Sequence, residues 1–199
     1  MIKSIIFDWG GVLINPPSED IMSYCSQHLN VQKIELKKIY GKYKSNFQKA
    51  TISEKQLWEK VCFSLKVDLP KTKSLWRDAF THSYHERKDV FSIIECLKKN
   101  GYKIGFMSNT EIPSMEFFKE CKYELFDVEI FSCLEKVRKP NIKIYEIGLN
   151  KLGVKPKESI FVDDQLENII AAKKIKMNTI HYLNFNQFKN ELIDLSVKL

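Results

Sequence analysis

The chain has 199 residues, of which 44% are apolar, enough to bury the core of one domain with a modest insertion. Its net charge of +7 comes mostly from lysines spread along the whole length. No dense basic arm is visible, so we expect no nucleic-acid partner. The five cysteines (Cys25, Cys62, Cys96, Cys121 and Cys133) are odd in number and form no C-x-x-C pair, which argues against a disulfide framework or a zinc site.

These cysteines are expected to be reduced core thiols in a cytoplasmic protein. The apolar stretch at the N-terminus is far too short to span a membrane, and Asp8 interrupts it before a secretory signal could form. We therefore expect no membrane partner. Nothing in the sequence indicates the oligomeric state.

The first expected element is a strand in residues 1–15, where Ile5, Ile6 and Phe7 form a continuous apolar run typical of a strand covered on both faces. Residues 16–88 differ. They open with Pro16-Pro17 and a predicted helix N-cap at Ser18, then carry apolar residues at helical spacing and no convincing strand.

Residues 89–199 alternate between helix and strand. We expect strands near 103–108, 129–132, 159–163 and 179–182, and helices near 89–99, 113–121, 140–153 and 166–175, followed by a terminal helix. This alternation predicts an α/β fold, a doubly wound and mostly parallel sheet with helices on both faces. Residues 1–15 and 89–199 would form that core, and 16–88 would be a helical insertion.

Polar residues follow the expected strands where each one ends, and ligands of open α/β sheets bind beyond the carboxyl ends of strands. The sets are Asp8 with Gly10-Gly11, Ser108-Asn109-Thr110, Arg138-Lys139-Pro140 in the loop after the third strand, and Asp163-Asp164. Each set alone has a simpler interpretation as a turn, a helix cap or a solvated charge. The adjacent acids Asp163 and Asp164 would repel each other unless a cation relieved them, so this pair indicates a metal site.

In this order and at strand ends, the segments FDWGGV, FMSNT, RKP and FVDDQLEN resemble the four motifs of the haloacid dehalogenase-like (HAD) hydrolase superfamily. The insertion directly after the first motif is similar to the helical cap of the family's C1 type. The D-x-G-G-V form of the first motif is similar to that of the family branch that includes epoxide-hydrolase phosphatase domains and some sugar-phosphate phosphatases. The resemblance implies a Rossmann-like core and a Mg²⁺-dependent phosphatase of a small phosphorylated metabolite, with sugar phosphates among the expected substrates.

The resemblance also implies roles for individual residues. Asp8 would be the nucleophile that forms an aspartyl-phosphate. Asp8, Asp164 and the main-chain carbonyl of Gly10 would ligate Mg²⁺, which prefers oxygen ligands, and Asp163 would be a further ligand, directly or through water.

The phosphate itself would be bound by donors from three loops. The Ser108 hydroxyl and the main-chain amides of Trp9 and Asn109 would donate to the transferring oxygens, and Lys139 would offset developing charge. Asn168 would orient the loop of the fourth motif.

Gly10 departs from the family pattern, because most of the family's phosphatases carry a second Asp at this position as general acid and base. Its absence should weaken turnover on poor leaving groups, since such a group contributes on the order of 100- to 10,000-fold. Two alternatives therefore stay open: a haloacid dehalogenase-type hydrolase, and a catalytically weak protein that binds a phosphorylated ligand or another protein. His82 and His85, near the return of the insertion to the core, could touch substrate, but we expect them to be solvated or locally hydrogen-bonded.

Overall fold

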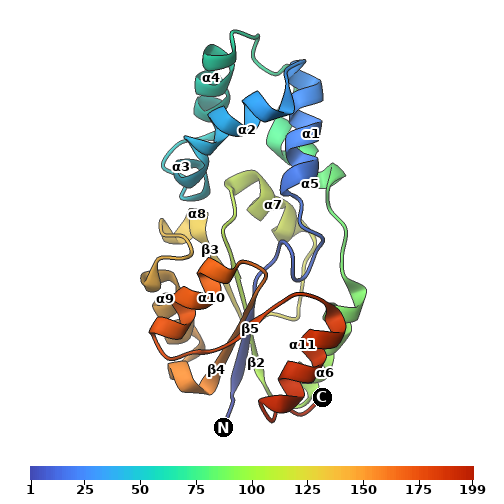
Figure 1. The fold of residues 1–199 in the computed structure, drawn as a ribbon, viewed down its shortest axis with the longest axis vertical. Helices are drawn as coiled ribbons and strands as arrows, with labels where there is room; N and C mark the ends of the chain where they lie inside the picture. Colours follow the sequence, from blue (N-terminus) through green and yellow to red (C-terminus); the bar gives the residue numbers. More distant parts are fainter.

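The computed structural model describes all 199 residues and contains one five-stranded parallel sheet in the order β3-β2-β1-β4-β5 (Figure 1). The strands are β1 (Ser4–Phe7), β2 (Lys103–Ser108), β3 (Val128–Phe131), β4 (Ser159–Asp163) and β5 (Asn178–His181). The predicted doubly wound α/β fold is confirmed.

Strand β1 is the centre of the sheet and every one of its residues is buried. Phe7 pairs in register with Phe106 of β2 on one side and with Val162 of β4 on the other. Because the three strands run parallel, the residues that end them or follow them lie at one edge of the sheet. This register brings Asp8, Ser108 and Asp163 to the same place.

Helices cover both faces of the sheet, as Figure 1 shows. They are α6 (Lys88–Lys99), α7 (Ile112–Glu120), α8 (Ser132–Glu135), α9 (Ile142–Leu152), α10 (Leu166–Lys174) and α11 (Phe185–Asp194), with a short 3-10 turn at Pro156–Glu158. Ile5 and Phe7 point into one apolar cluster, shared with α6, α7 and α11, whereas Ile6 points into a second cluster, shared with α9 and α10. Alternate residues of a strand face opposite sides, so the all-apolar run of β1 is what two covered faces require.

Five helices lie between β1 and α6 in the chain and above the carboxyl edge of the sheet (Figure 1). These inserted helices are α1 (Ser18–Leu29), α2 (Lys33–Gly41), α3 (Lys44–Gln48), α4 (Glu54–Leu65) and α5 (Leu75–His82). The two chain segments that join them to the core run antiparallel, since Ile14 bridges Glu86 and the Asn15 amide donates to the His85 carbonyl at 2.9 Å. Whether residues 16–88 act as a separate cap stays a prediction.

Three local expectations differ from the structure. Ser18 is the first residue of α1 and not its N-cap; Pro17 holds that place, and no side chain caps the helix. The helix expected from Pro140 begins at Ile142, because the Asn141 side chain accepts a hydrogen bond from the Lys143 amide and caps it. All five cysteines are free thiols, but Cys121 is exposed and Cys96 half-buried, so only three belong to the core. None of the helices is both long enough and apolar enough to cross a membrane.

Candidate active site

Asp8 stands at the floor of a cavity of about 400 Å³ between the sheet edge and the inserted helices. Its amide continues the ladder of β1 by donating to the Val162 carbonyl at 2.9 Å, which fixes the residue at the strand end. The Trp9 amide donates to Asp8 Oδ1 at 2.7 Å. The Trp9 ring is buried against Phe80, Phe106 and Phe118, so the loop after β1 is anchored by packing.

Lys139 is 1% exposed and bridges two acids. Its Nζ lies 2.7 Å from Asp8 Oδ1 and 2.7 Å from Asp163 Oδ2, and donates to the Met107 carbonyl at 3.1 Å. The Asn109 side chain holds the Lys139 backbone, accepting from its amide at 2.8 Å and donating to its carbonyl at 3.0 Å. Asn109 therefore positions Lys139, a contact that sequence reasoning did not anticipate.

Asp163 is fully buried and has hydrogen-bond partners on both carboxylate oxygens. Oδ1 accepts from the Gln165 amide at 2.8 Å and from Asn168 Nδ2 at 2.9 Å, while Oδ2 is the oxygen that faces Lys139. Asn168 contacts Asp163 in the way expected of a residue that orients this loop. With these contacts, Asp163 serves to place Lys139.

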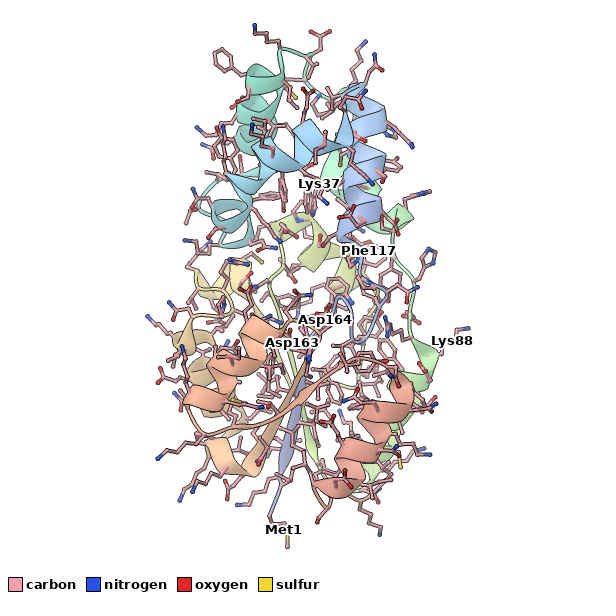
Figure 2. The ribbon with its side chains drawn as sticks, viewed as in Figure 1. Met1, Lys37, Lys88, Phe117, Asp163 and Asp164 are labelled. Carbon is pink, nitrogen blue, oxygen red and sulfur yellow. The ribbon has the colours of Figure 1, made fainter.

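Asp164 differs from its neighbour because one of its oxygens is free. Oδ2 accepts from Gln165 Nε2 at 2.7 Å, but Oδ1 is buried with no hydrogen-bond partner. Gly11, with φ of +92°, lets the backbone pass directly against this carboxyl group. One carboxylate oxygen from each of Asp8, Asp163 and Asp164 lies within 4.8 Å of the other two. Figure 2 labels Asp163 and Asp164 at the edge of the sheet that faces the inserted helices. An all-oxygen donor set with an unpartnered carboxylate oxygen fits a hard divalent cation such as Mg²⁺.

The charges at this floor do not balance. Burial raises the pKa of Asp8 to about 8, with Lys139 opposing the shift and Asp163 adding to it. Burial is the largest single influence on the pKa of Lys139 and lowers it. The negative charges of Asp163 and Asp8 together outweigh burial, so the pKa of Lys139 is raised. Burial also raises the pKa of Asp164. With all three acids ionised, three negative charges would face one ammonium group, an excess that a divalent cation would neutralise.

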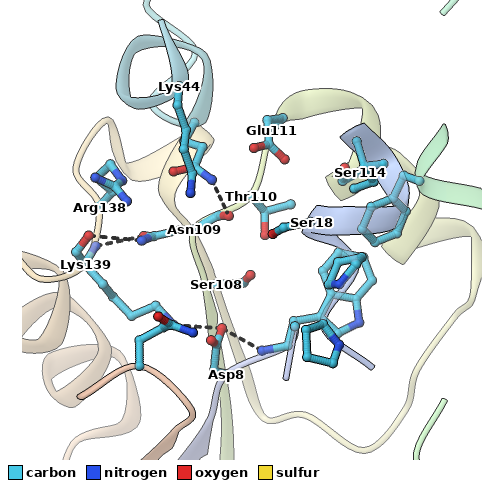
Figure 3. A pocket seen from close by; sticks show the side chains of 18 of the residues that line it. Asp8, Ser18, Lys44, Ser108, Asn109, Thr110, Glu111, Ser114, Arg138 and Lys139 are labelled. Atoms are coloured by element: carbon cyan, nitrogen blue, oxygen red, sulfur yellow. Dashed lines mark hydrogen bonds and ion pairs between the residues drawn. The ribbon is translucent and has the colours of Figure 1, made fainter. Parts of the chain in front are cut away.

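The walls of the cavity come from the loop after β2 and from the inserted helices (Figure 3). Ser108 lies above Asp8 at the end of β2 and lines the same cavity. Above it, Gln48 Nε2 of α3 donates to the Asn109 carbonyl at 3.2 Å, and the Ser132 hydroxyl donates to the Gln48 carbonyl at 2.6 Å. The loop that carries Ser108 and Asn109 is thus tied to the inserted helices.

Gly10 lines the cavity two residues after Asp8, and little room surrounds its α carbon. A β carbon at this position would lie 3.1 Å from Cδ of Pro17. A side chain here requires the Pro17 ring to move by a few tenths of an ångström. The Pro17 ring therefore occupies part of the space that an acidic side chain at position 10 would need.

Most of the residues singled out at the strand ends line this one cavity, and Asp163 and Gly11 lie against lining residues, whereas Pro140 does not line it. His82 and His85 are exposed and lie outside it. Sequence reasoning placed Arg138 at this edge without giving it a role, and it missed several other lining residues, among them Tyr40, Lys44, Gln48 and Glu111. Glu111 and Arg138 directly adjoin predicted site residues, a signal that was present in the sequence. Trp76 is 3% exposed, packs in the core and also lines the cavity.

Comparison with known proteins agrees with this geometry. The chain is 39% identical over 92 residues to the sesquiterpene phosphatase astK of Aspergillus oryzae, a match that covers 45% of this chain and 47% of astK. The chain thus spans about half the length of that relative.

Solved structures share the fold over nearly the whole chain. A predicted HAD-like hydrolase from Porphyromonas gingivalis has a TM-score of 0.79 at 20% identity and matches over 100% of both chains. The HAD family enzyme bt-2542 from Bacteroides thetaiotaomicron, in complex with magnesium and inorganic phosphate, has a TM-score of 0.71 at 20% identity over 90% of this chain and 93% of its own. The model of the haloacid dehalogenase-like hydrolases matches residues 2–176, which include every strand-end motif described above, and the chain belongs to this family.

Proposed function

We propose that the protein is a Mg²⁺-dependent phosphomonoesterase that acts on a small phosphorylated metabolite through an aspartyl-phosphate on Asp8. The observation that carries the proposal is the floor of the cavity, where the buried carboxylate of Asp8 lies 2.7 Å from Lys139 and within a cluster of three acids. Phosphoryl transfer needs a nucleophile in line with the leaving group and positive charge around the transferring oxygens. Asp8 would supply the nucleophile, and Lys139 the positive charge.

In the first step, a carboxylate oxygen of Asp8 bonds to phosphorus and the bond from phosphorus to the leaving oxygen breaks. The leaving group departs as an alkoxide or takes a proton from solvent. In the second step, water attacks the phosphorus of the aspartyl-phosphate, releases inorganic phosphate and restores Asp8. The Ser108 hydroxyl and the amides of Trp9 and Asn109 bind the phosphate oxygens, and Lys139 offsets their charge.

Mg²⁺, when bound, would neutralise charge shared between the phosphate and Asp8. Asp8, Asp164 and the Gly10 carbonyl would hold it. Asp163 was predicted as a direct or water-mediated ligand, and its saturated hydrogen bonds favour the indirect role. The magnesium and phosphate in the bt-2542 complex support a fold that accommodates both together.

The inserted helices would act as a C1-type cap of residues 16–88 on a core of 1–15 and 89–199, excluding water from the cavity. We place the protein in the cytoplasm, with no nucleic-acid or membrane partner. A dehalogenase is disfavoured by the unpartnered Asp164 oxygen beside Asp8, because displacing halide needs no metal. A weak binding protein stays the alternative because Gly10 offers no acid.

The test is a panel of phosphorylated metabolites and haloacids, assayed with Mg²⁺ and with EDTA, for the wild type, Asp8→Asn and Asp194→Asn. We expect Mg²⁺-dependent phosphate release that falls on the order of a thousand-fold or more in Asp8→Asn, as for loss of a covalent nucleophile. Asp194 is exposed on α11, so its variant is the matched control. Halide release that persists in EDTA would indicate a dehalogenase. No phosphate release and no Mg²⁺ binding would favour the binding protein.

A further inference from the structure

Glu111 is a buried acid that the proposed chemistry does not use. It follows Ser108-Asn109-Thr110 directly, is 5% exposed and lines the cavity. Figure 3 shows its carboxyl group pointing into the cavity from the side opposite Asp8. It therefore faces the part of the cavity where a substrate's carrier group would lie once the phosphate sits on Asp8.

The carboxyl group does not serve the fold in either of the usual ways. Glu111 is the N-cap residue of α7, but its side chain makes no capping hydrogen bond. It forms no ion pair, and its hydrogen-bond partner is the Tyr40 hydroxyl of α2, which donates at 3.5 Å. Burial raises the pKa of this carboxyl group, and its own backbone amide, the side chains of Gln48 and Trp76 and the charge of Lys44 oppose the shift only in part. Burying a weakly partnered acid costs stability, so a role in binding explains its presence better than a role in folding.

The neighbours of Glu111 indicate what it binds. Tyr40 and Trp76 stack with ring centroids 5.1 Å apart and line the same cavity, beside the amide group of Gln48. A carboxyl group beside an amide and aromatic rings suits hydroxyl groups on a compact carrier. A cationic carrier is disfavoured, because Lys44 and Arg138 also line this cavity. A hydrocarbon carrier would cover the Glu111 carboxyl group and Gln48 Oε1, an atom with no hydrogen-bond partner in the protein, without offering either of them a hydrogen bond.

We propose that Glu111 is a specificity-determining residue that hydrogen-bonds a hydroxyl group of the carrier, so that the substrates are phosphate esters of small hydroxylated molecules and not of hydrocarbon chains. This inference rests on the proposed function. If Glu111 has this role, the substrate differs in kind from that of a sesquiterpene phosphatase, as astK is named, because a sesquiterpene is a hydrocarbon chain.

The experiment uses two pairs of esters matched in size and shape: glucose 6-phosphate with cyclohexylmethyl phosphate, and erythritol 4-phosphate with butyl phosphate. Phenyl phosphate serves as a reference with a good leaving group. The wild type should favour the hydroxylated member of at least one pair by about 10-fold or more in kcat/KM. Glu111→Leu should lower kcat/KM for that member by about 10- to 100-fold, mainly through KM, and leave phenyl phosphate nearly unchanged. Glu111→Gln, which keeps hydrogen-bonding capacity, should retain most of the preference.

Glu116→Gln is the matched control, because Glu116 lies on the same helix, is exposed and makes no ion pair. Melting temperatures should show that Glu111→Leu stays folded. Equal turnover of both members of each pair by the wild type, or a uniform loss on all esters in Glu111→Leu, would overturn the inference while leaving the proposed function intact. An absence of turnover on every ester, phenyl phosphate included, would overturn the proposed function and the inference with it.

Discussion

Gly11 allows the backbone after β1 to pass against the carboxyl group of Asp164, because a β carbon at Gly11 would lie 2.3 Å from Asp164 Oδ2. No side chain fits that space, and the φ of +92° is itself unfavourable for other residues. The position of Asp164, an acid of the fourth motif, therefore requires glycine at position 11 in the first motif, although the two residues lie far apart in the sequence.

Gly11→Ala should consequently displace Asp164 and strain the loop. We expect a loss of about 1–3 kcal/mol in the free energy of unfolding and a clear weakening of Mg²⁺ binding. Urea unfolding and calorimetric Mg²⁺ titration measure the two effects. Gly41→Ala is the stability control, since nothing lies within 4 Å of its β-carbon position. Unchanged Mg²⁺ affinity in Gly11→Ala would contradict the link between Gly11 and the metal.

Asp163 and Asp164 are adjacent but should respond differently to substitution by Asn. Asp163→Asn breaks a fully buried ion pair with Lys139 and should destabilise the protein by about 3–5 kcal/mol. Asp164→Asn removes a carboxylate that has no cationic partner in the protein, so it should change stability little and Mg²⁺ affinity strongly. Parallel unfolding and Mg²⁺ titrations compare them. A larger loss of Mg²⁺ affinity in Asp163→Asn would make Asp163 the direct ligand.

Mg²⁺ should raise the melting temperature, because a cation that binds only the folded state stabilises it by mass action. At a concentration 100 times Kd the gain is about 2.7 kcal/mol. For a chain of this size that corresponds to a rise of about 5–10 °C. Thermal unfolding in Mg²⁺ and in EDTA measures the shift, and Ca²⁺ tests its selectivity. If Asp164→Asn shows the same rise as the wild type, the metal binds elsewhere.

Much of the sheet and the cavity floor could be predicted from sequence, for a physical reason. β2 and β4 begin and end at Lys103–Ser108 and Ser159–Asp163, as expected, because buried parallel strands need apolar runs and polar residues end them. The helix α8 was not predicted, since its four residues, Ser132–Glu135, are too few to carry a helical period. The cavity wall was also missed: Tyr40 and Gln48 face the site only because of how α2 and α3 pack, which periodicity does not determine.

Gly10→Asp tests whether a missing acid limits turnover, but Pro17 occupies part of the space that the new side chain needs. The new side chain would meet Pro17 at 3.1 Å, so the single variant should gain little. Gly10→Asp combined with Pro17→Ala should gain about 10-fold or more on alkyl phosphates, which need a protonated leaving group. Acyl and anomeric phosphates should gain much less, and Pro17→Ala alone is the control. An equal gain on all substrates would contradict a general acid at this position.

The buried carboxyl of Glu111 should make stability depend on pH. Because burial raises its pKa in the folded state, ionisation opposes folding: stability is greatest below the unfolded pKa and falls as the pH rises through the higher folded value. The groups that face Glu111 are Lys44 on α3 and Tyr40 on α2, and Tyr40 stays neutral because burial and Glu111 raise its pKa. Gln48 and Trp76 carry no charge.

Glu111→Gln should therefore match the melting temperature of the wild type near pH 4 and exceed it at pH 8, while Glu116→Gln should have the melting temperature of the wild type throughout. A constant difference between Glu111→Gln and wild type across this range would mean that the carboxyl group keeps its ordinary pKa in the folded protein.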